Sequence, residues 1–293
     1  MFDVIIIGGS SAGLSAALVL GRSRRKVLVF DDGQPCNRFS HASHGFLTRD
    51  GVAPDELLQI AREQLQPYES VEFCADTVLS ITHIPSGFQV ETSAGDSYSA
   101  RKVLLATGLK DVLPAIEGIQ EFWGSSVFHC PYCDGWEVRD QPLVVMGSTE
   151  TTFHQAMMVH HWSSDLTLCT NAVWNPSPEQ RQLLDKNGVR LIEQAISRIE
   201  GENGKIQQIV LADGDVLRFT AMFIHPEAQH RTPFAEMLGC AVSEQNRVQV
   251  DVLGRTNVDG VYAAGDVANP MRSIAASVAQ GRGPPLLLAS ITI

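Results

Sequence analysis

Long apolar runs are absent from this 293-residue chain, and so is an excess of positive charge. No stretch approaches the roughly 18 consecutive apolar residues that a membrane span requires. Lysine and arginine number 22 against 33 aspartate and glutamate residues, which gives a net charge of −11. Because no basic run offers a footprint for phosphates, we expect the protein to bind neither nucleic acid nor a membrane.

Cysteine is also scarce, since the chain has only six, which excludes a small fold held together by disulfides. Four cysteines stand alone and are expected to be small buried hydrophobic residues: Cys36, Cys74, Cys169 and Cys240. Only Cys130 and Cys133 are spaced as a pair. The first residues lack the basic segment and cleavage site of a signal peptide, so we expect a cytoplasmic protein.

The pattern of strand, glycine turn, helix and strand occurs twice. The first copy has the strand Phe2–Ile7, a turn at Gly8, a helix over residues 12–20 and a strand over residues 26–30. The second has a strand over residues 143–146, a turn at Gly147, a helix to about residue 162 and a strand over residues 166–169. Such βαβ units are typical of doubly wound parallel sheets, so the sequence predicts an α/β fold.

Further elements are expected between and after these units. They are a helix over residues 55–65, hairpin strands Gly87–Thr92 and 97–103, a strand over 102–107, strands over 205–212 and 215–219, a strand over 260–266 and a helix over 271–280. Gly283 and the two prolines after it should end this last helix, because proline cannot continue one.

The first glycine turn reads Gly8-Gly9-Ser10-Ser11-Ala12-Gly13 and matches a dinucleotide fingerprint. Gly8 permits the tight turn, and Gly13 lets the helix pack close to the sheet with its N–H groups toward a pyrophosphate. An acid for the ribose hydroxyls is expected about 20 residues further on. Asp31 lies 31 − 13 = 18 residues past Gly13, and Asp32 is the alternative. The expected cofactor ligands here are Gly8, Ser10, Ser11, Ala12, Gly13 and Asp31.

Two shorter turns, Ala106-Thr107-Gly108 and Ala264-Gly265-Asp266, follow apolar strands. Alone each is more often a packing feature than a site. Because open α/β sheets bind ligands at strand ends, we add Ala106, Thr107, Gly108, Gly265 and Asp266 to the candidate cofactor-binding residues.

The segment Cys130-Pro131-Tyr132-Cys133-Asp134 indicates thiol–disulfide chemistry. One thiol of such a pair attacks a substrate disulfide, and the other resolves the mixed disulfide. Asp134 could exchange the proton that this step requires, or it could cap a helix. Zinc is the rival interpretation, but there is no second C-x-x-C. The adjacent His160 and His161 would point to different faces of a helix, so we expect no metal site.

In this order the motifs resemble the low-molecular-weight thioredoxin reductase family over nearly the whole chain. The subgroup that it resembles most is thioredoxin-reductase-like, deeply rooted and without NADPH motifs. Its marks are C-P-Y-C and an S-H-x-x-H-G-F-L-T-R-D-G stretch, here residues 40–51. That subgroup is related to fungal dithiol oxidases, which close disulfides in small toxins such as gliotoxin.

The resemblance implies two Rossmann-like domains of the FAD/NAD(P)-binding, three-layer ββα type. The FAD domain would span residues 1–112 plus 242–293, with a pyridine-nucleotide-type domain inserted over residues 113–241. It also implies a homodimer, FAD as cofactor, and a thioredoxin-like protein or a small dithiol or disulfide as partner. Cys133 would face the flavin, Cys130 would exchange with substrate, Asp134 would be the acid/base, and Asp266 would bind the ribityl hydroxyls.

The second glycine turn departs from the family pattern. It reads Gly147-Ser148-Thr149-Glu150-Thr151-Thr152, and family members that use NADPH have glycine and a small residue in place of Thr149 and Thr152. Residues 170–175 contain no lysine or arginine for a 2′-phosphate. NADPH is therefore doubtful as a cofactor. The sequence predicts an FAD-dependent thiol–disulfide oxidoreductase that works without NADPH, or alternatively an oxygen-dependent oxidase of small dithiols.

Four other side chains keep two interpretations each. His41 and His44 could shuttle protons near a flavin, or they could be solvated or capping loop residues. Trp123 and Trp136 flank the cysteine pair and could stack near a flavin or fill the core. The tail from Gly283 onward departs from the helix that the family would place there, and it could cover the flavin or fray.

Overall fold

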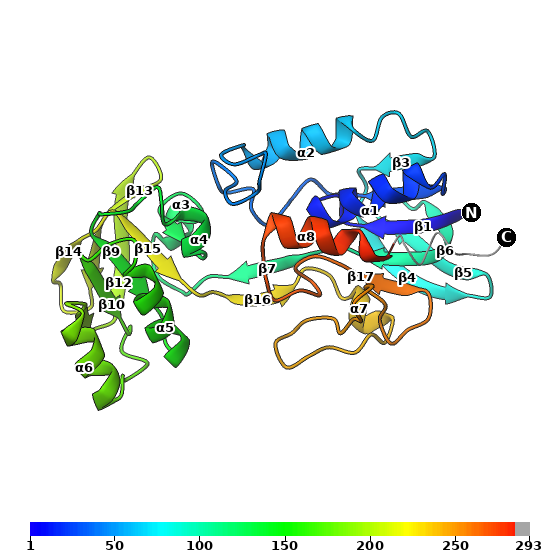
Figure 1. Ribbon diagram of the computed structural model, residues 1–293. Helices are drawn as coiled ribbons and strands as arrows, with labels where there is room; N and C mark the ends of the chain where they lie inside the picture. Colours follow the sequence, from blue (N-terminus) through cyan, green and yellow to red (C-terminus); the bar gives the residue numbers. More distant parts are fainter. Residues whose placement is uncertain (285–293) are drawn as a thin grey trace. The chain divides into compact units, whose positions relative to one another are not determined.

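A computed structural model describes residues 1–284, which fall into two units (Figure 1). Unit 1 comprises Met1–Arg38, Ala53–Lys110 and the chain from Ala228 onward. Unit 2 comprises Phe39–Val52 and Asp111–Glu227. In this part of the chain no helix is both long and apolar enough to cross a membrane.

A mainly parallel sheet forms the centre of unit 1. Its order is β3-β2-β1-β6-β5-β4, and β17 pairs with β6. The parallel strands are β1 (Phe2–Ile7), β2 (Val27–Phe30), β3 (Val71–Cys74), β17 (Val261–Ala263) and the C-terminal half of β6 (Ser97–Leu105). The antiparallel strands are β4 (Val78–Ile84) and β5 (Gly87–Thr92), with the N-terminal half of β6. One continuous strand thus replaces the two predicted over residues 97–107, because its two halves find different partners.

Both faces of the parallel strands are buried. Along β1, Val4 and Ile6 face the helices, whereas Ile5 and Ile7 face the other side, as the period of two along a strand requires. The helices on the first face are α1 (Ser11–Arg22), α2 (Pro54–Glu63) and α8 (Ile274–Gly281). The second face is covered by β4, β5 and the short α7 (Phe234–Met237). These are the three layers of the predicted ββα fold.

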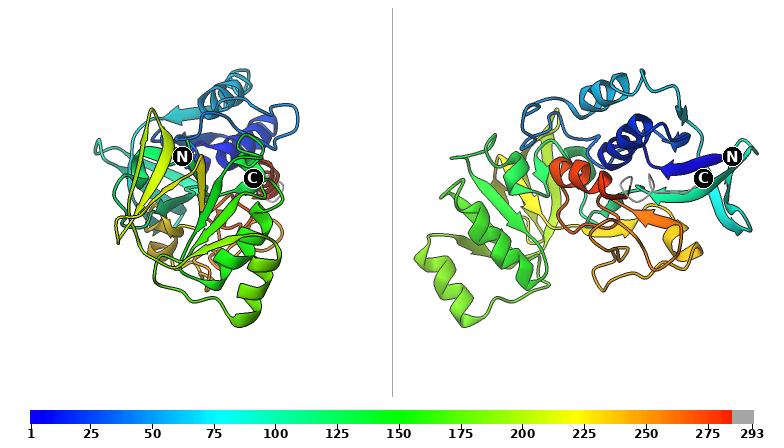
Figure 2. Two further views of the ribbon diagram at one scale, coloured as in Figure 1. Left: turned by 90° about the vertical axis from the view of Figure 1, so that its left-hand side faces the viewer. Right: turned by 45° about the vertical axis from the view of Figure 1, so that its right-hand side comes forward.

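Unit 2 repeats this plan around a five-stranded parallel sheet (Figure 2). In spatial order its strands are β11 (Arg190–Ile192), β10 (Leu166–Cys169), β9 (Leu143–Met146), β15 (Ala221–Ile224) and β8 (Val127–Phe128). One face is covered by α5 (Glu150–Val159) and α6 (Pro178–Lys186). The other is covered by α3 (Ile119–Phe122) and an antiparallel sheet of β12 (Ile196–Glu202), β13 (Lys205–Leu211) and β14 (Val216–Arg218). The prediction of two Rossmann-like domains, one inserted into the other, is confirmed by the fold.

The strands β7 (Leu109–Val112) and β16 (Glu227–His230) carry the chain between the units and pair with each other. The inserted unit ends at Glu227, and unit 1 resumes at Ala228, which is 242 − 228 = 14 residues before the predicted position. The reason is that Phe234 and Leu238 of the intervening segment are buried in the core of unit 1. Residues 39–52, predicted to be part of the FAD domain, group instead with unit 2.

The helix α8 ends at Gly281, close to the predicted end, although Gly283 and Pro284 are again helical. The rest of the tail, for which the sequence left two interpretations, lies outside the described residues.

Candidate active site

The first glycine turn of unit 1 is closely packed, and this explains its glycines. A Cβ on Gly8, whose φ is +112°, would lie 2.2 Å from the carbonyl oxygen of Ala106. A Cβ on Gly13 would lie 1.9 Å from the carbonyl oxygen of Gly8. Any side chain at either position would push α1 away from the strand ends. The turn therefore holds the start of α1 directly above the C-terminal ends of β1 and β6, where α/β sheets bind ligands.

The N-terminus of α1 is open to an anion in the described structure. Ser10 is the N-cap residue, but its side chain makes no capping hydrogen bond to the helix. The helix begins at Ser11, and the first helical bond runs from the Leu14 N–H to the Ser10 carbonyl, at 2.9 Å. The earlier N–H groups and the positive end of the helix dipole are thus presented to a negatively charged group such as a pyrophosphate.

The acid at the end of β2 lies over the glycine turn. A Cβ on Gly9 would lie 2.6 Å from the Cβ of Asp31, so this carboxylate lies over the glycine turn. Asp31 accepts a hydrogen bond from the Gly33 N–H at 3.1 Å and forms an ion pair with Arg62 of α2. The alternative acid, Asp32, turns instead toward Arg231, at 3.1 Å. Asp31 is therefore the acid of the turn, and Arg62 is a neighbour that the sequence did not reveal.

The two short turns lie beside the glycine turn because their strands are neighbours. The Ala106 N–H donates to Ile7, and the Ala264 N–H donates to Leu105, which aligns the ends of β1, β6 and β17. Ala12 is the meeting point of these segments. A Cβ added to Gly265 would lie 2.9 Å from the Cβ of Ala12, and a Cβ added to Gly281 would lie 2.2 Å from the carbonyl oxygen of Ala12. All the predicted cofactor-binding residues of unit 1 thus gather around the start of α1. They are Gly8, Ser10, Ser11, Ala12, Gly13, Asp31, Ala106, Thr107, Gly108, Gly265 and Asp266.

Asp266 has protein partners as well. Its carboxylate lies 3.5 Å from the Arg272 Nε and 3.4 Å from the Ser277 hydroxyl. Arg272 also donates to the Cys36 sulfur, at 3.1 Å. The prediction that Cys36 is simply a buried hydrophobic residue is therefore wrong, since the thiol is only half-buried and accepts from a cation. Cys74 is half-buried too, whereas Cys169 and Cys240 are buried as expected.

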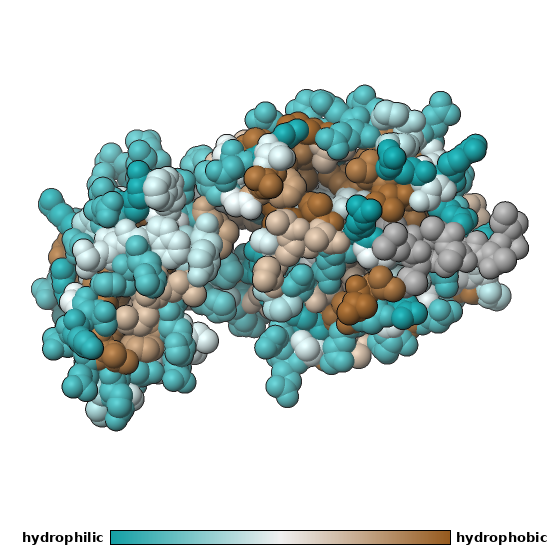
Figure 3. Space-filling model, in the orientation of Figure 1, coloured by the Kyte–Doolittle hydropathy of each residue, from teal (hydrophilic) through white to brown (hydrophobic). Residues whose placement is uncertain are grey.

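Taken together, these residues fit FAD. The cradle of small residues would be filled by any added Cβ, and the open helix N-terminus suits its pyrophosphate. Apolar surface breaks the hydrophilic surface along α1 and α8 in the face shown in Figure 3, as the rings of a dinucleotide would require.

The glycine turn of unit 2 is closed by its own side chains. Thr149 is the N-cap of α5 and forms a capping box with Thr152, in which the side chain of each meets the backbone of the other. A Cβ on Gly147 would lie 2.3 Å from the Thr152 hydroxyl. Glu150 stands in the first turn of the helix and accepts from Gln180 at 3.3 Å. The Thr149 N–H thus faces the Thr152 hydroxyl at 3.5 Å, the Thr152 N–H donates to the Thr149 carbonyl at 3.0 Å, and a carboxylate lies in the same turn.

One arginine does approach the loop after β10, from α6. Arg181 donates to Asn175 and, at 2.6 Å and 3.1 Å, to both carboxylate oxygens of Glu193. These hydrogen bonds raise the pKa of Arg181 and lower that of Glu193, so each holds the other in its charged form. A 2′-phosphate at this loop would meet a cation that already has a carboxylate partner.

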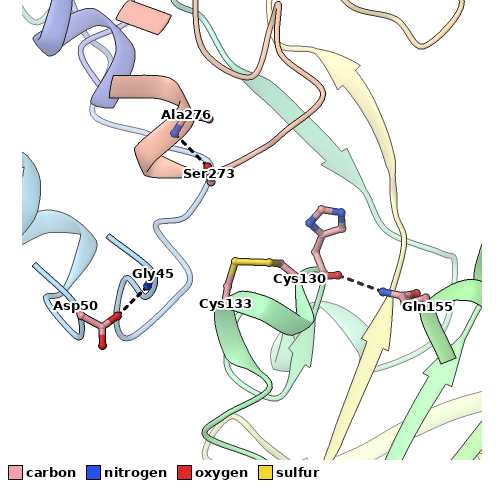
Figure 4. The surroundings of a disulfide bond; sticks show 8 residues. Gly45, Asp50, Cys130, Cys133, Gln155, Ser273 and Ala276 are labelled. Carbon is pink, nitrogen blue, oxygen red and sulfur yellow. Dashed lines mark hydrogen bonds between the residues drawn. A yellow bond between two sulfur atoms is a disulfide. The ribbon is translucent and has the colours of Figure 1, made fainter. Parts of the chain in front are cut away.

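The cysteine pair lies on a single helical turn, α4 (Pro131–Asp134). Cys130 is its N-cap residue, and the Cys133 N–H donates to the Cys130 carbonyl at 3.1 Å. The two cysteines form a disulfide with their Cα atoms 5.3 Å apart (Figure 4). Proline at the first helical position fixes the turn without losing a needed N–H. Both cysteines are half-buried.

Asp134 is the last residue of this turn and not its N-cap, which removes the capping interpretation. Burial raises the pKa of its carboxyl to about 7. This value is the net result of burial, which is the largest cause, a smaller upward effect of the charge of Glu137 and an opposing effect of the charge of His44. An acid with a pKa near neutrality can both give and take a proton at physiological pH.

The sequence did not identify the side chain that holds the backbone next to the cysteine pair. Gln155 of α5 is buried, and its amide donates to the carbonyl of His129, next to Cys130, at 3.2 Å (Figure 4). It also donates to the Ile224 carbonyl at the end of β15, at 3.3 Å. The signal that could have identified Gln155 was a polar residue at a buried position of α5.

The tryptophans differ. Trp123 packs against the core of unit 2, which favours the core-filling interpretation. Trp136 is exposed, and the Arg139 guanidinium lies 4.0 Å from its ring centre. Tyr132, between the cysteines, is exposed as well and meets the Trp162 ring edge-on.

Known proteins resemble this chain along nearly its whole length. A family model described as pyridine nucleotide-disulphide oxidoreductase matches residues 2–281. Thioredoxin reductase sirT of Leptosphaeria maculans is 30% identical over 299 residues, which cover 96% of this chain and 91% of that protein. Thioredoxin reductase tcpT of Claviceps purpurea is 29% identical, with coverage of 95% and 90%. The crystal structure of an oxidoreductase from Agrobacterium tumefaciens matches with a TM-score of 0.93 at 39% identity, covering 98% of this chain and 97% of that one.

Proposed function

This chain belongs to the pyridine nucleotide-disulphide oxidoreductase family, and on that premise we propose that it passes electrons between FAD and a substrate disulfide or dithiol through Cys130 and Cys133. It is a flavoprotein disulfide oxidoreductase of the thioredoxin-reductase-like type. The single observation that carries the proposed path is the half-buried Cys130–Cys133 disulfide on one helical turn, directly followed by a carboxyl with a pKa of about 7.

Each side chain of the pair has one role in the reducing direction. The Cys130 thiolate attacks a substrate disulfide, forms a mixed disulfide and releases one substrate thiolate. Cys133 then attacks the Cys130 sulfur, which closes the protein disulfide again and releases the second substrate thiolate. Asp134 gives the departing sulfur a proton and takes one from the attacking thiol. We assign Cys130 to the substrate side and Cys133 to the flavin side on the family pattern.

The cradle around the start of α1 would hold the FAD. The N–H groups of Ser11, Ala12 and Gly13 would face the pyrophosphate, Asp31 the ribose, and Asp266 the ribityl chain. FAD supplies a two-electron carrier, which the cysteine pair needs in order to be oxidised or reduced repeatedly.

We propose that the reducing equivalents do not come from NADPH. The support is the closed turn of unit 2, where Thr149 and Thr152 cap α5 and Glu150 adds negative charge. The anaerobic test mixes the FAD-loaded protein with NADPH, NADH or dithiothreitol and follows the visible absorbance of the flavin. We expect dithiothreitol to bleach it and neither nicotinamide to do so. Rapid bleaching by NADPH would refute this part of the proposal.

The same closed turn favours a second candidate, an oxidase of small dithiols. In that net reaction a dithiol loses two electrons and two protons to become a disulfide, and oxygen takes them up as hydrogen peroxide. Stoichiometric peroxide on admitting air to the dithiol-reduced protein would support the oxidase. Reduction of a thioredoxin-like protein without peroxide would support the reductase. We also propose a homodimer by resemblance, which sedimentation equilibrium tests directly.

A further inference from the structure

The loop Phe39–Val52 of unit 2 is a closed structure. Ser43 and Val52 pair in an isolated bridge, in which the Ser43 N–H donates to the Val52 carbonyl at 2.7 Å. Inside it, the Gly45 N–H donates to the Asp50 carboxylate at 2.8 Å (Figure 4). His44 stands between Ser43 and Gly45 and is therefore fixed on both sides by backbone hydrogen bonds. Its side chain is 22% exposed, while the side chain of His41 in the same loop points into solvent.

The imidazole of His44 lies between two carboxylates. Its Nε2 is 3.5 Å from the Glu137 Oε1, and its Nδ1 is 3.7 Å from the Asp50 Oδ1. Glu137 follows α4, so this contact ties the loop to the segment that carries the cysteine pair. Each ring nitrogen of His44 thus faces a carboxylate oxygen.

Two charged groups act on Asp134, and their effects are opposite. Glu137 and His44 are the ionisable side chains that act electrostatically on this carboxyl. A negative Glu137 makes it harder for Asp134 to lose its proton, and a positive His44 makes it easier. The contact between His44 and Glu137 therefore joins the two groups that oppose each other at Asp134. Asp50 acts on the far side of the ring, and Arg139 is occupied by the Trp136 ring.

We propose that His44, held between Asp50 and Glu137, is a positioning residue for the proton chemistry of the cysteine pair: it binds Glu137 beside the helical turn that carries Asp134 and opposes the negative charge of Glu137 at that carboxyl. The proposal deepens the proposed function, since it assumes that Asp134 exchanges protons with the thiols. Without His44, Asp134 would keep its proton to higher pH, so a smaller fraction of it near neutral pH would be ready to accept the proton that a cysteine thiol must lose before it attacks.

A purely structural role for His44 makes a different prediction. If His44 only held the loop, loss of either partner of the His44–Glu137 contact would loosen it in the same way. The two substitutions would then move the titration of Asp134 in the same direction or leave it unchanged. An electrostatic role requires opposite directions, because the two side chains carry opposite charges.

The first experiment follows the Asp134 carboxyl directly. FAD-loaded protein with carbon-13 in its aspartate carboxyl groups is titrated by NMR in the oxidised state, and the Asp134 signal is identified by its loss in Asp134→Asn. We expect the midpoint to rise by about half a pH unit or more in His44→Gln and to fall by a similar amount in Glu137→Gln. His41→Gln, in the same loop but exposed, is the matched control and should leave the midpoint unchanged. Shifts of equal sign, or none, overturn the proposal.

The second experiment asks whether the carboxyl governs the thiols. The dithiol-reduced, FAD-loaded variants react anaerobically with 5,5′-dithiobis(2-nitrobenzoate) over a pH series. The midpoint of the rate profile should move in the same direction as the NMR midpoint in both variants, and an unmoved profile would overturn the role of His44. Failure of the proposed function gives a different result. In that case the pair would exchange with the aromatic disulfide under Asp134 control, but dithiol reduction would not bleach the flavin.

Discussion

Replacement of Asp134 by asparagine should stabilise the protein at alkaline pH while it impairs thiol exchange. Burial, together with the charge of Glu137, raises the pKa of this carboxyl from 3.8 to about 7. The native state therefore binds the proton more tightly than the unfolded chain does. Below pH 3.8 the carboxyl is protonated in both states, so the free energy of unfolding is at its full value there, and it falls as the pH rises toward 7.

The magnitude follows from the shift. Between about pH 5.5 and pH 8, wild type should lose about 1.5 × 1.36, or about 2 kcal/mol, because the proton is still held at the lower pH and is gone at the higher. The amide that Asp134→Asn introduces cannot ionise, so this variant should not show the loss.

Urea unfolding of the FAD-loaded protein at the two pH values, followed by far-ultraviolet circular dichroism, measures the difference. Asp140→Asn is the matched control, because it removes the same charge from an exposed position in the same segment and should keep the wild-type pH dependence. If Asp134→Asn lost as much stability as wild type over this range, the raised pKa would be refuted. The same variant should exchange thiols at least about 100-fold more slowly near neutral pH, which is the lower range for loss of a general acid–base group.

Three other tests have defined outcomes. Gly13→Ala places a Cβ 1.9 Å from a backbone oxygen, so it should abolish FAD retention, as the ratio of flavin to protein absorbance will show. Cys133→Ser should eliminate flavin bleaching by dithiols, whereas Cys74→Ser, at a half-buried free cysteine, should retain it, and equal activity of the two would contradict the assigned pair. Thr152→Ala removes the hydroxyl that accepts from the Thr149 N–H and should cost about 1 kcal/mol in urea unfolding. An unchanged midpoint would show that the cap contributes nothing.

The local elements were largely predictable because each depends on neighbouring residues. The strand β10 and the hairpin strand β5 have the predicted limits, since runs of apolar or alternating residues bounded by turns need no distant partner to be identified. The strands β3 and β4 were missed, because part of each faces solvent and their apolar signal is weak.

In the candidate sites, too, the contiguous motifs were predictable and the distant partners were not. The glycine turn and the cysteine pair are short motifs, and the chemistry of each is set by its own residues. The partners of their acids come from elsewhere in the chain: Arg62 beside Asp31, Arg272 beside Asp266, and His44 near Asp134. No local pattern predicts such pairs, because they depend on how separate elements pack.

The sequence by itself thus determined the two ββα units, the tight glycine turn and the spacing of the cysteine pair, since each depends on contiguous residues. Only the tertiary structure decided which acid faces the glycine turn, where the second unit ends, and that the loop of His44 belongs with the cysteine pair. The physical reason is that the proton affinity of Asp134 depends on burial and on charges at a distance. His44 lies 134 − 44 = 90 residues earlier in the chain, and folding brings its charge to bear on the carboxyl.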